Sequence, residues 1–162
     1  MIVISDTSPV INLAAVGQLE LLKKLYEKVV IAQAVYDEIV VTGSGQAGAK
    51  EVESANWIEV KEVANHTLVA SLQLELDKGE SESIALALES NADLLLLDER
   101  KGRAIASRLG LKFIGLLGVL VEAKQKGFIP AVKPVMDDII SKAGFWISQD
   151  LYKRVLESVH EQ

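Results

Sequence analysis

The sequence predicts an α/β fold in three layers, with a central, mostly parallel sheet of four to five short strands between helices. Short apolar segments alternate along the chain with longer segments in which apolar residues recur at helical spacing. The apolar segments lack polar alternation, which is typical of strands buried on both faces. No tight hairpin turn joins two of them, so the helices between them are expected to connect parallel strands.

Five short segments are expected to form the strands. In chain order they are residues 2–4, 28–31, 57–60, 94–97 and 112–114. Leucine has no strand preference of its own, so the strand at 94–97 is inferred from its length and its surroundings. The strand at 57–60 is expected at an edge of the sheet.

The helices are expected between and after these strands. Helical spacing covers residues 11–25 with a break near Gly17, and then 34–41, 67–76, 80–90, 103–109, 116–126, 132–143 and 149–159. Ser8 is expected to cap the first helix, with Pro9 at its first position. The glycine-rich stretch at 43–48 is expected to be a loop.

Length and composition fit a single domain over residues 1–162 and exclude several kinds of site. The chain of 162 residues is 49% hydrophobic and has two histidines and no cysteine. Disulfides, thiolate zinc sites and multi-histidine metal sites are therefore excluded. No apolar run is long enough to span a membrane and no signal peptide is recognisable, so we expect a cytoplasmic protein without membrane attachment.

Acidic residues follow two of the predicted strands. Asp6 comes after the first strand, and Asp98 comes directly after Leu94–Leu97. Ligands of open parallel sheets bind outside the carboxyl ends of the strands. If these two strands are neighbours, their carboxylates converge, which is unfavourable unless a cation neutralises them. The alternative is that each aspartate is an ordinary turn or cap residue.

Further acids could join this pair from two helices. One candidate is Asp37 or Glu38, and the other is Glu80 or Glu82 in the first turn of a helix. A solvated helix face or the helix dipole would also explain these residues. Carboxylate oxygens select Mg²⁺ or Mn²⁺, so the four positions together predict a site for one of these ions.

Four segments in this order resemble the PIN-domain nucleases, the fold of the toxin ribonucleases in VapC-type toxin–antitoxin pairs. The segments are ISDTSPVINLA, VYDEIV, GESESIALALE and ADLLLLDERKGRAIASRLGL. The resemblance covers residues 1 to about 120. The C-terminal helices at 121–162 look like the tail of an uncharacterised PIN subfamily.

The resemblance implies a metal-dependent ribonuclease that hydrolyses RNA phosphodiester bonds. It implies that Asp6, Glu38, an acid of the GESE segment and Asp98 form a catalytic, metal-binding quartet with Mg²⁺ or Mn²⁺. The usual third residue is Asp, whereas this chain offers Glu80 or Glu82, which point about 200° apart on a helix. Glu99 could be an additional outer ligand. A cognate antitoxin protein and a homodimer are also implied.

Residues beside the expected site could bind the RNA substrate. The net charge of −6 counts against a nucleic-acid binder, but clustered carboxylates make a chain acidic while needing only a local basic rim. Such a rim is expected at Arg100, Lys101 and Arg103, where the alternative is a solvated helix face. Thr7 and Ser8 could hydrogen-bond a carboxylate or a phosphate. Aromatic residues form no regular stacking platform, and Trp146 is expected to pack in the core or an interface.

Other functions fit the residues less well. A receiver domain needs two acids near the first strand, and ISDTS has one; haloacid-dehalogenase-like enzymes need a second Asp where Ser8 stands. GSGQAGAK lacks the Ser or Thr that follows the lysine of a phosphate-binding loop. The remaining alternative is a non-catalytic PIN-fold module that binds nucleic acid or protein, which the Glu-for-Asp change favours.

Overall fold

Five parallel strands form one sheet in the computed structural model, which describes all residues from Met1 to Gln162. The strands are β1 (Val3–Ser5), β2 (Val29–Ala32), β3 (Ile58–Lys61), β4 (Leu94–Leu96) and β5 (Phe113–Ile114). Their order across the sheet is β3-β2-β1-β4-β5, and every pairing is parallel. The predicted parallel sheet of four to five short strands is confirmed.

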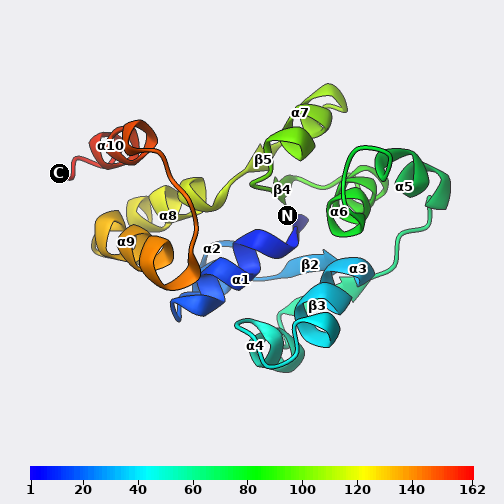
Figure 1. The fold of residues 1–162 in the computed structure, drawn as a ribbon, viewed down its shortest axis with the longest axis horizontal. Helices are drawn as coiled ribbons and strands as arrows, with labels where there is room; N and C mark the ends of the chain where they lie inside the picture. The colour runs from blue at the N-terminus through cyan, green and yellow to red at the C-terminus, as the bar shows by residue number, and fades with distance from the viewer.

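Helices lie on both sides of this sheet. Figure 1 shows α5 and α6 on one side of the strands and α8, α9 and α10 on the other. Helix α6 packs on β1, β2 and β4 and also against α3, α5 and α7. The helical segments are α1 (Thr7–Ala15), α2 (Glu20–Tyr26), α3 (Gln33–Tyr36), the π-helix η1 (Asp37–Thr42), α4 (Ala49–Ser54), α5 (His66–Leu72), α6 (Lys78–Glu89), α7 (Arg100–Arg108), α8 (Leu116–Gln125), α9 (Val132–Ala143) and α10 (Gln149–Ser158).

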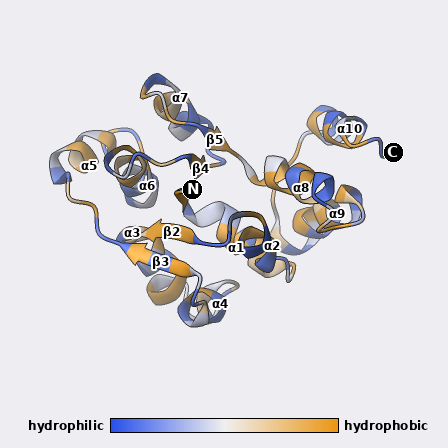
Figure 2. Cartoon of the chain, turned by 180° about the vertical axis from the view of Figure 1, so that it is seen from behind, coloured by the Kyte–Doolittle hydropathy of each residue, from blue (hydrophilic) through white to orange (hydrophobic).

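One hydrophobic core holds the strands and helices together. A single cluster of 42 buried hydrophobic residues runs from Val3 in β1 to Val159 after α10, so the last helix shares its core with the first strand. All residues of β1 and β2 are buried, which explains why these strands lack polar alternation. In Figure 2 the strands β2 and β3 are largely hydrophobic, whereas α7 and α10 carry both hydrophilic and hydrophobic residues. None of the helices is long and apolar enough to cross a membrane.

The strand order changes direction between β1 and β4. The chain adds β2 and β3 on one side of β1, and then adds β4 and β5 on the other side. Ser5 of β1 pairs with Leu96 of β4, and the Asp6 N–H donates to the Leu96 carbonyl oxygen at 3.0 Å. In such sheets this point of reversal opens a crevice at the carboxyl ends of the strands. Asp6 and Asp98 both lie at that crevice.

Three local expectations are corrected. Helix α1 begins at Thr7 with Asp6 in the N-cap position, so the prediction that Ser8 caps this helix is wrong. The expected helix at 34–41 is a short α3 followed by the π-helix η1. The sequence prediction also missed the short helix α4, which follows the glycine-rich loop. The Gly48 N–H donates to Glu51 Oε2 at 2.9 Å and so caps the beginning of this helix.

Candidate active site

Three carboxylates surround the backbone of Gly79 in the first turn of α6. A Cβ atom on Gly79 would lie 2.9 Å from Glu38 Oε2 and 3.6 Å from both Asp6 Oδ1 and Asp77 Oδ1. These acids come from the end of β1, from η1 and from the start of α6. The missing side chain of Gly79 therefore leaves a small space bounded by three acidic groups.

Asp6 is the buried member of this group. Its side chain is 4% exposed and makes no capping hydrogen bond to α1. Burial raises the pKa of Asp6 to about 7, and the charges of Asp77, Glu38 and Asp98 add to this effect. A carboxylate held at the end of a buried strand is therefore unfavourable in its charged form unless a cation is near.

Asp98 lies on the other side of the crevice, held by hydrogen bonds. The Leu116 N–H donates to Asp98 Oδ1 at 2.8 Å, and Ser8 Oγ donates to Oδ2 at 3.3 Å. Asn12 Nδ2 in turn donates to Ser8 Oγ at 3.0 Å, so Ser8 positions Asp98 instead of capping the helix. Burial raises the pKa of Asp98, although these hydrogen bonds and the charge of Arg103 act in the opposite direction.

Glu80 joins the acidic group from the first turn of α6. Its side chain is 7% exposed, and Oε2 is buried without a hydrogen-bond partner. Burial raises the pKa of Glu80 to about 8, with further contributions from the charges of Asp77, Asp6 and Glu99. A Cβ on Gly102 of α7 would lie 2.9 Å from this oxygen, so glycine is the residue that leaves room for it.

Glu82 points away from the acidic group. Glu82 Oε1 accepts a hydrogen bond from the Ala34 N–H at 3.0 Å, which caps the first turn of α3. Asp37 lines the same hollow as Glu38, Asp77 and Gly79, and its Oδ1 accepts a hydrogen bond from Gln33 Nε2 of α3. The structure therefore brings Glu80 and Glu38 to Asp6, leaves Asp37 at the border of this hollow, and turns Glu82 to α3.

Glu38 reaches Asp6 from the π-helix η1. Thr7 Oγ1 donates to Glu38 Oε2 at 2.9 Å, so Thr7 orients a carboxylate, as Ser8 does for Asp98. π-Helical turns are rare and occur often at functional sites. Gly43 follows η1, and a Cβ there would lie 2.6 Å from the Ile39 carbonyl oxygen and 2.9 Å from that of Glu38. A residue without a side chain is therefore needed where η1 ends.

Asp77 is the acidic residue that sequence reasoning missed. It occupies the N-cap position of α6, where Oδ1 accepts from the Glu80 N–H at 2.8 Å. The pattern Asp77-Lys78-Gly79-Glu80 is a helix-start signal, and it could have drawn attention to this residue. Its charge contributes to the raised pKa values of both Asp6 and Glu80.

A family model described as a PIN domain matches residues 2–161 of this chain. The chain belongs to the PIN-domain family. The resemblance inferred from the four sequence segments is confirmed at this level, and the match also includes the C-terminal helices. PIN domains are generally nucleases that act on nucleic acid, and they usually use divalent metal ions. A comparison with curated proteins gives no match.

The acidic group of this PIN domain fits a divalent cation by its chemistry. The structure has no group of three or more His, Cys, Asp or Glu side chains that could hold a metal ion as they are placed. The carboxylates border a common space but do not converge on one point. Two features nevertheless favour a cation: the unpartnered buried Oε2 of Glu80, and the space at Gly79 bounded by oxygens of Asp6, Glu38 and Asp77. An all-oxygen donor set of this kind suits Mg²⁺ or Mn²⁺.

Basic residues without acidic partners line the start of α7. No acidic oxygen lies within 4 Å of a side-chain nitrogen of Arg100, Lys101 or Arg103. The Arg103 guanidinium lies 4.9 Å from the centroid of the Phe113 ring, and its Nε is buried without a partner. None of the three residues forms an ion pair, and the charge of Arg103 acts on Asp98.

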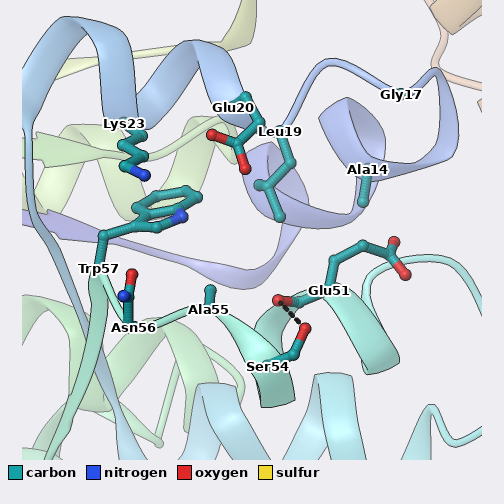
Figure 3. A pocket seen from close by; sticks show the side chains of 10 residues that line it. All are labelled: Ala14, Gly17, Leu19, Glu20, Lys23, Glu51, Ser54, Ala55, Asn56 and Trp57. Carbon is teal, nitrogen blue, oxygen red and sulfur yellow. Dashed lines mark hydrogen bonds between the residues drawn. The ribbon is translucent and has the colours of Figure 1, made fainter.

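A separate pocket lies at the opposite edge of the sheet. Figure 3 shows this cavity of about 400 Å³, where Trp57 and Lys23 face Glu20 and Glu51 across the opening. Its residues come from the end of α1, from α2 and the residues before it, from α4, and from the segment between α4 and β3. The amino ends of the strands are on this side, away from the carboxyl ends that carry Asp6 and Asp98. This pocket has no gathered carboxylates and is not the candidate active site.

Proposed function

We propose that this PIN domain is a metal-dependent endoribonuclease, with Asp6, Glu38, Glu80 and Asp98 as its catalytic, metal-binding residues. The observation that carries the proposal is the acidic group at the β1–β4 crevice, where burial and mutual repulsion raise the pKa values of Asp6, Glu80 and Asp98. Such a group is costly to fold without a cation, and perturbed carboxylates in a crevice are typical of functional sites.

Each residue of the candidate site has a defined role in this proposal. Bound Mg²⁺ or Mn²⁺ would supply activation of water and neutralisation of charge on the phosphate. Asp6, Glu38, Glu80 and Asp98 would hold the ion, and Asp77 would add negative charge to the group. Thr7 and Ser8 orient Glu38 and Asp98 by the hydrogen bonds described above. Glu99, in the N-cap position of α7, is close enough to influence Asp98 and is a candidate outer ligand.

Arg100, Lys101 and Arg103 are proposed to bind the RNA phosphates. None of them forms an ion pair, and they follow Asp98 and Glu99 in the chain. Contacts of this kind hold a nucleic acid in position without reading its sequence. RNA as the substrate, a toxin role with a cognate antitoxin protein, and a homodimer rest on the resemblance to VapC-type toxins.

The test is cleavage of structured and single-stranded RNA by the purified protein in Mg²⁺, in Mn²⁺ and in EDTA. Asp98→Asn is the informative variant, because an amide oxygen can still accept from the Leu116 N–H while the charge is lost. Cleavage that needs metal and disappears in Asp98→Asn supports the proposal. A folded wild-type protein that binds RNA without cleaving it in either metal would instead support the non-catalytic module.

A further inference from the structure

A large groove begins at Asp98 and leads away from the acidic group. Its volume is about 1030 Å³. Its lining residues come from α7, from β5 with α8, and from the C-terminal segment that contains Phe145, Trp146 and Leu151. Three of its lining residues are charged, namely Asp98, Arg100 and Arg103. The rest of the lining is apolar or small, apart from Ser107.

Trp146 is the unusual residue of this groove. It is 81% exposed, so of the two places expected for Trp146 the core is wrong, and an interface stays a prediction. It lies between Gly144, whose φ of +70° ends α9, and Ser148, which caps α10 through a hydrogen bond from the Leu151 N–H. The backbone on both sides is therefore held in place. A large aromatic ring is presented at the groove without covering any part of the core.

The groove combines cationic and aromatic side chains. Arg100 and Arg103 line it together with Phe113, Phe145 and Trp146, and neither arginine forms an ion pair. A nucleotide has the same two parts, an anionic phosphate and a flat base with apolar faces. Exposed aromatic rings beside cationic side chains are the usual means of binding single-stranded nucleic acid.

We propose that this groove binds a nucleotide of single-stranded RNA next to the scissile phosphate, with its base stacked on Trp146 and its phosphate on Arg100 and Arg103. The inference rests on the proposed nuclease function, because it extends the same site outward from Asp98. Stacking accepts any base, so the groove selects unpaired RNA over duplex RNA and does not select a sequence. A purely apolar partner would leave Arg100 unpaired at the groove, which favours an anionic ligand.

The test uses the fluorescence of the full chain in EDTA, which prevents cleavage. The chain has two tryptophans, and Trp57 is only 8% exposed in the separate pocket, so quenching by a soluble ligand reports mainly on Trp146. We expect a single-stranded oligoribonucleotide to quench the emission. The same sugar–phosphate chain without bases is expected to bind weakly and to leave the emission unchanged.

Variants separate stacking from a general loss of apolar surface. Trp146→Ala is expected to weaken oligonucleotide binding roughly 5- to 150-fold, the range that corresponds to losing one stacked base. Trp146→Phe is expected to retain affinity within about threefold, because a ring remains. Phe128→Ala removes a partly exposed aromatic ring outside the groove and is expected to bind as the wild type does.

The possible outcomes distinguish this inference from the nuclease proposal. Binding through Trp146 by a protein that cleaves no RNA would refute the nuclease proposal and leave the groove assignment standing. RNA cleavage with unchanged affinity in Trp146→Ala would overturn the groove assignment alone. A dimer that becomes monomeric in Trp146→Ala, with unchanged oligonucleotide affinity, would also overturn it and assign the groove to a second copy of the chain.

Discussion

Replacing Asp6 by Asn is expected to stabilise the metal-free protein while it abolishes metal-dependent cleavage. Asp6 is buried beside other acids, so its ionised form is unfavourable in the folded state. Asn has nearly the same shape and is well tolerated at a helix N-cap position, which is where Asp6 lies. The substitution therefore removes a buried charge with little change in packing.

The size of the effect follows from the pKa of Asp6. Its rise from 3.8 to about 7 means that the folded state binds this proton more tightly than the unfolded state does. The folded protein therefore loses stability as pH rises from about 4 to about 7, and the loss is complete above that range. At 1.36 kcal/mol for each pKa unit the limit is about 4 kcal/mol, and relaxation of the crevice reduces it to about 1–3 kcal/mol.

Urea unfolding in EDTA at pH 4 and pH 8 measures this difference. Asp6→Asn is expected to be more stable than the wild type by about 1–3 kcal/mol at pH 8 and nearly equal to it at pH 4. Asp150→Asn, at an exposed carboxylate of α10, is the control and is expected to show no such gain. With Mn²⁺ the wild type should gain stability and Asp6→Asn should not. If Asp6→Asn is the less stable protein at pH 8 in EDTA, the account of the acidic group is wrong.

Three more variants test separate parts of the structure. Gly79→Ala places a Cβ 2.9 Å from Glu38 Oε2, so we expect cleavage to fall roughly 10- to 100-fold with an unchanged unfolding midpoint; full activity would show that this space is not used. Arg100→Ala combined with Lys101→Ala is expected to weaken RNA binding and to reduce the slope of log affinity against log salt, measured by filter binding; an unchanged slope would remove both residues from the rim. Glu161→Gln is expected to lower the free energy of unfolding by about 1–3 kcal/mol in urea, because Glu161 Oε2 accepts from both Lys124 Nζ and the Val132 N–H at 2.8 Å; an unchanged value would show that this contact does not stabilise the C-terminal helices.

The sheet and the two aspartates of the crevice were predictable because they depend on short-range patterns. Buried apolar segments ending near Asp6 and Asp98 indicate parallel strands, and the strand order makes the two segments neighbours. The choice between Glu80 and Glu82 was not predictable from spacing. It depends on how α6 packs, with Glu82 turned to the first turn of α3 and Glu80 turned to α7.

Other features depend on tertiary contacts that a single sequence does not display. The sequence around Asp77 predicts only a helix cap. Asp77 comes close to Asp6 because α6 packs on β1, which the sequence does not display. The π-helix η1 depends on the close approach of Gly43 to the preceding carbonyl groups. Trp146 has a large aromatic side chain of the kind usually found in a core. Only the path of the chain from α9 to α10 shows that it is exposed.

We propose that the acidic group at the β1–β4 crevice is a metal-dependent nuclease site. The most direct measurement compares Glu80→Gln and Glu82→Gln in RNA cleavage with Mn²⁺, since the two glutamates lie on one helix and only Glu80 faces the group. Loss of cleavage in Glu80→Gln, with cleavage retained by folded Glu82→Gln, is the predicted result. Retained cleavage in Glu80→Gln together with its loss in Glu82→Gln would contradict the account.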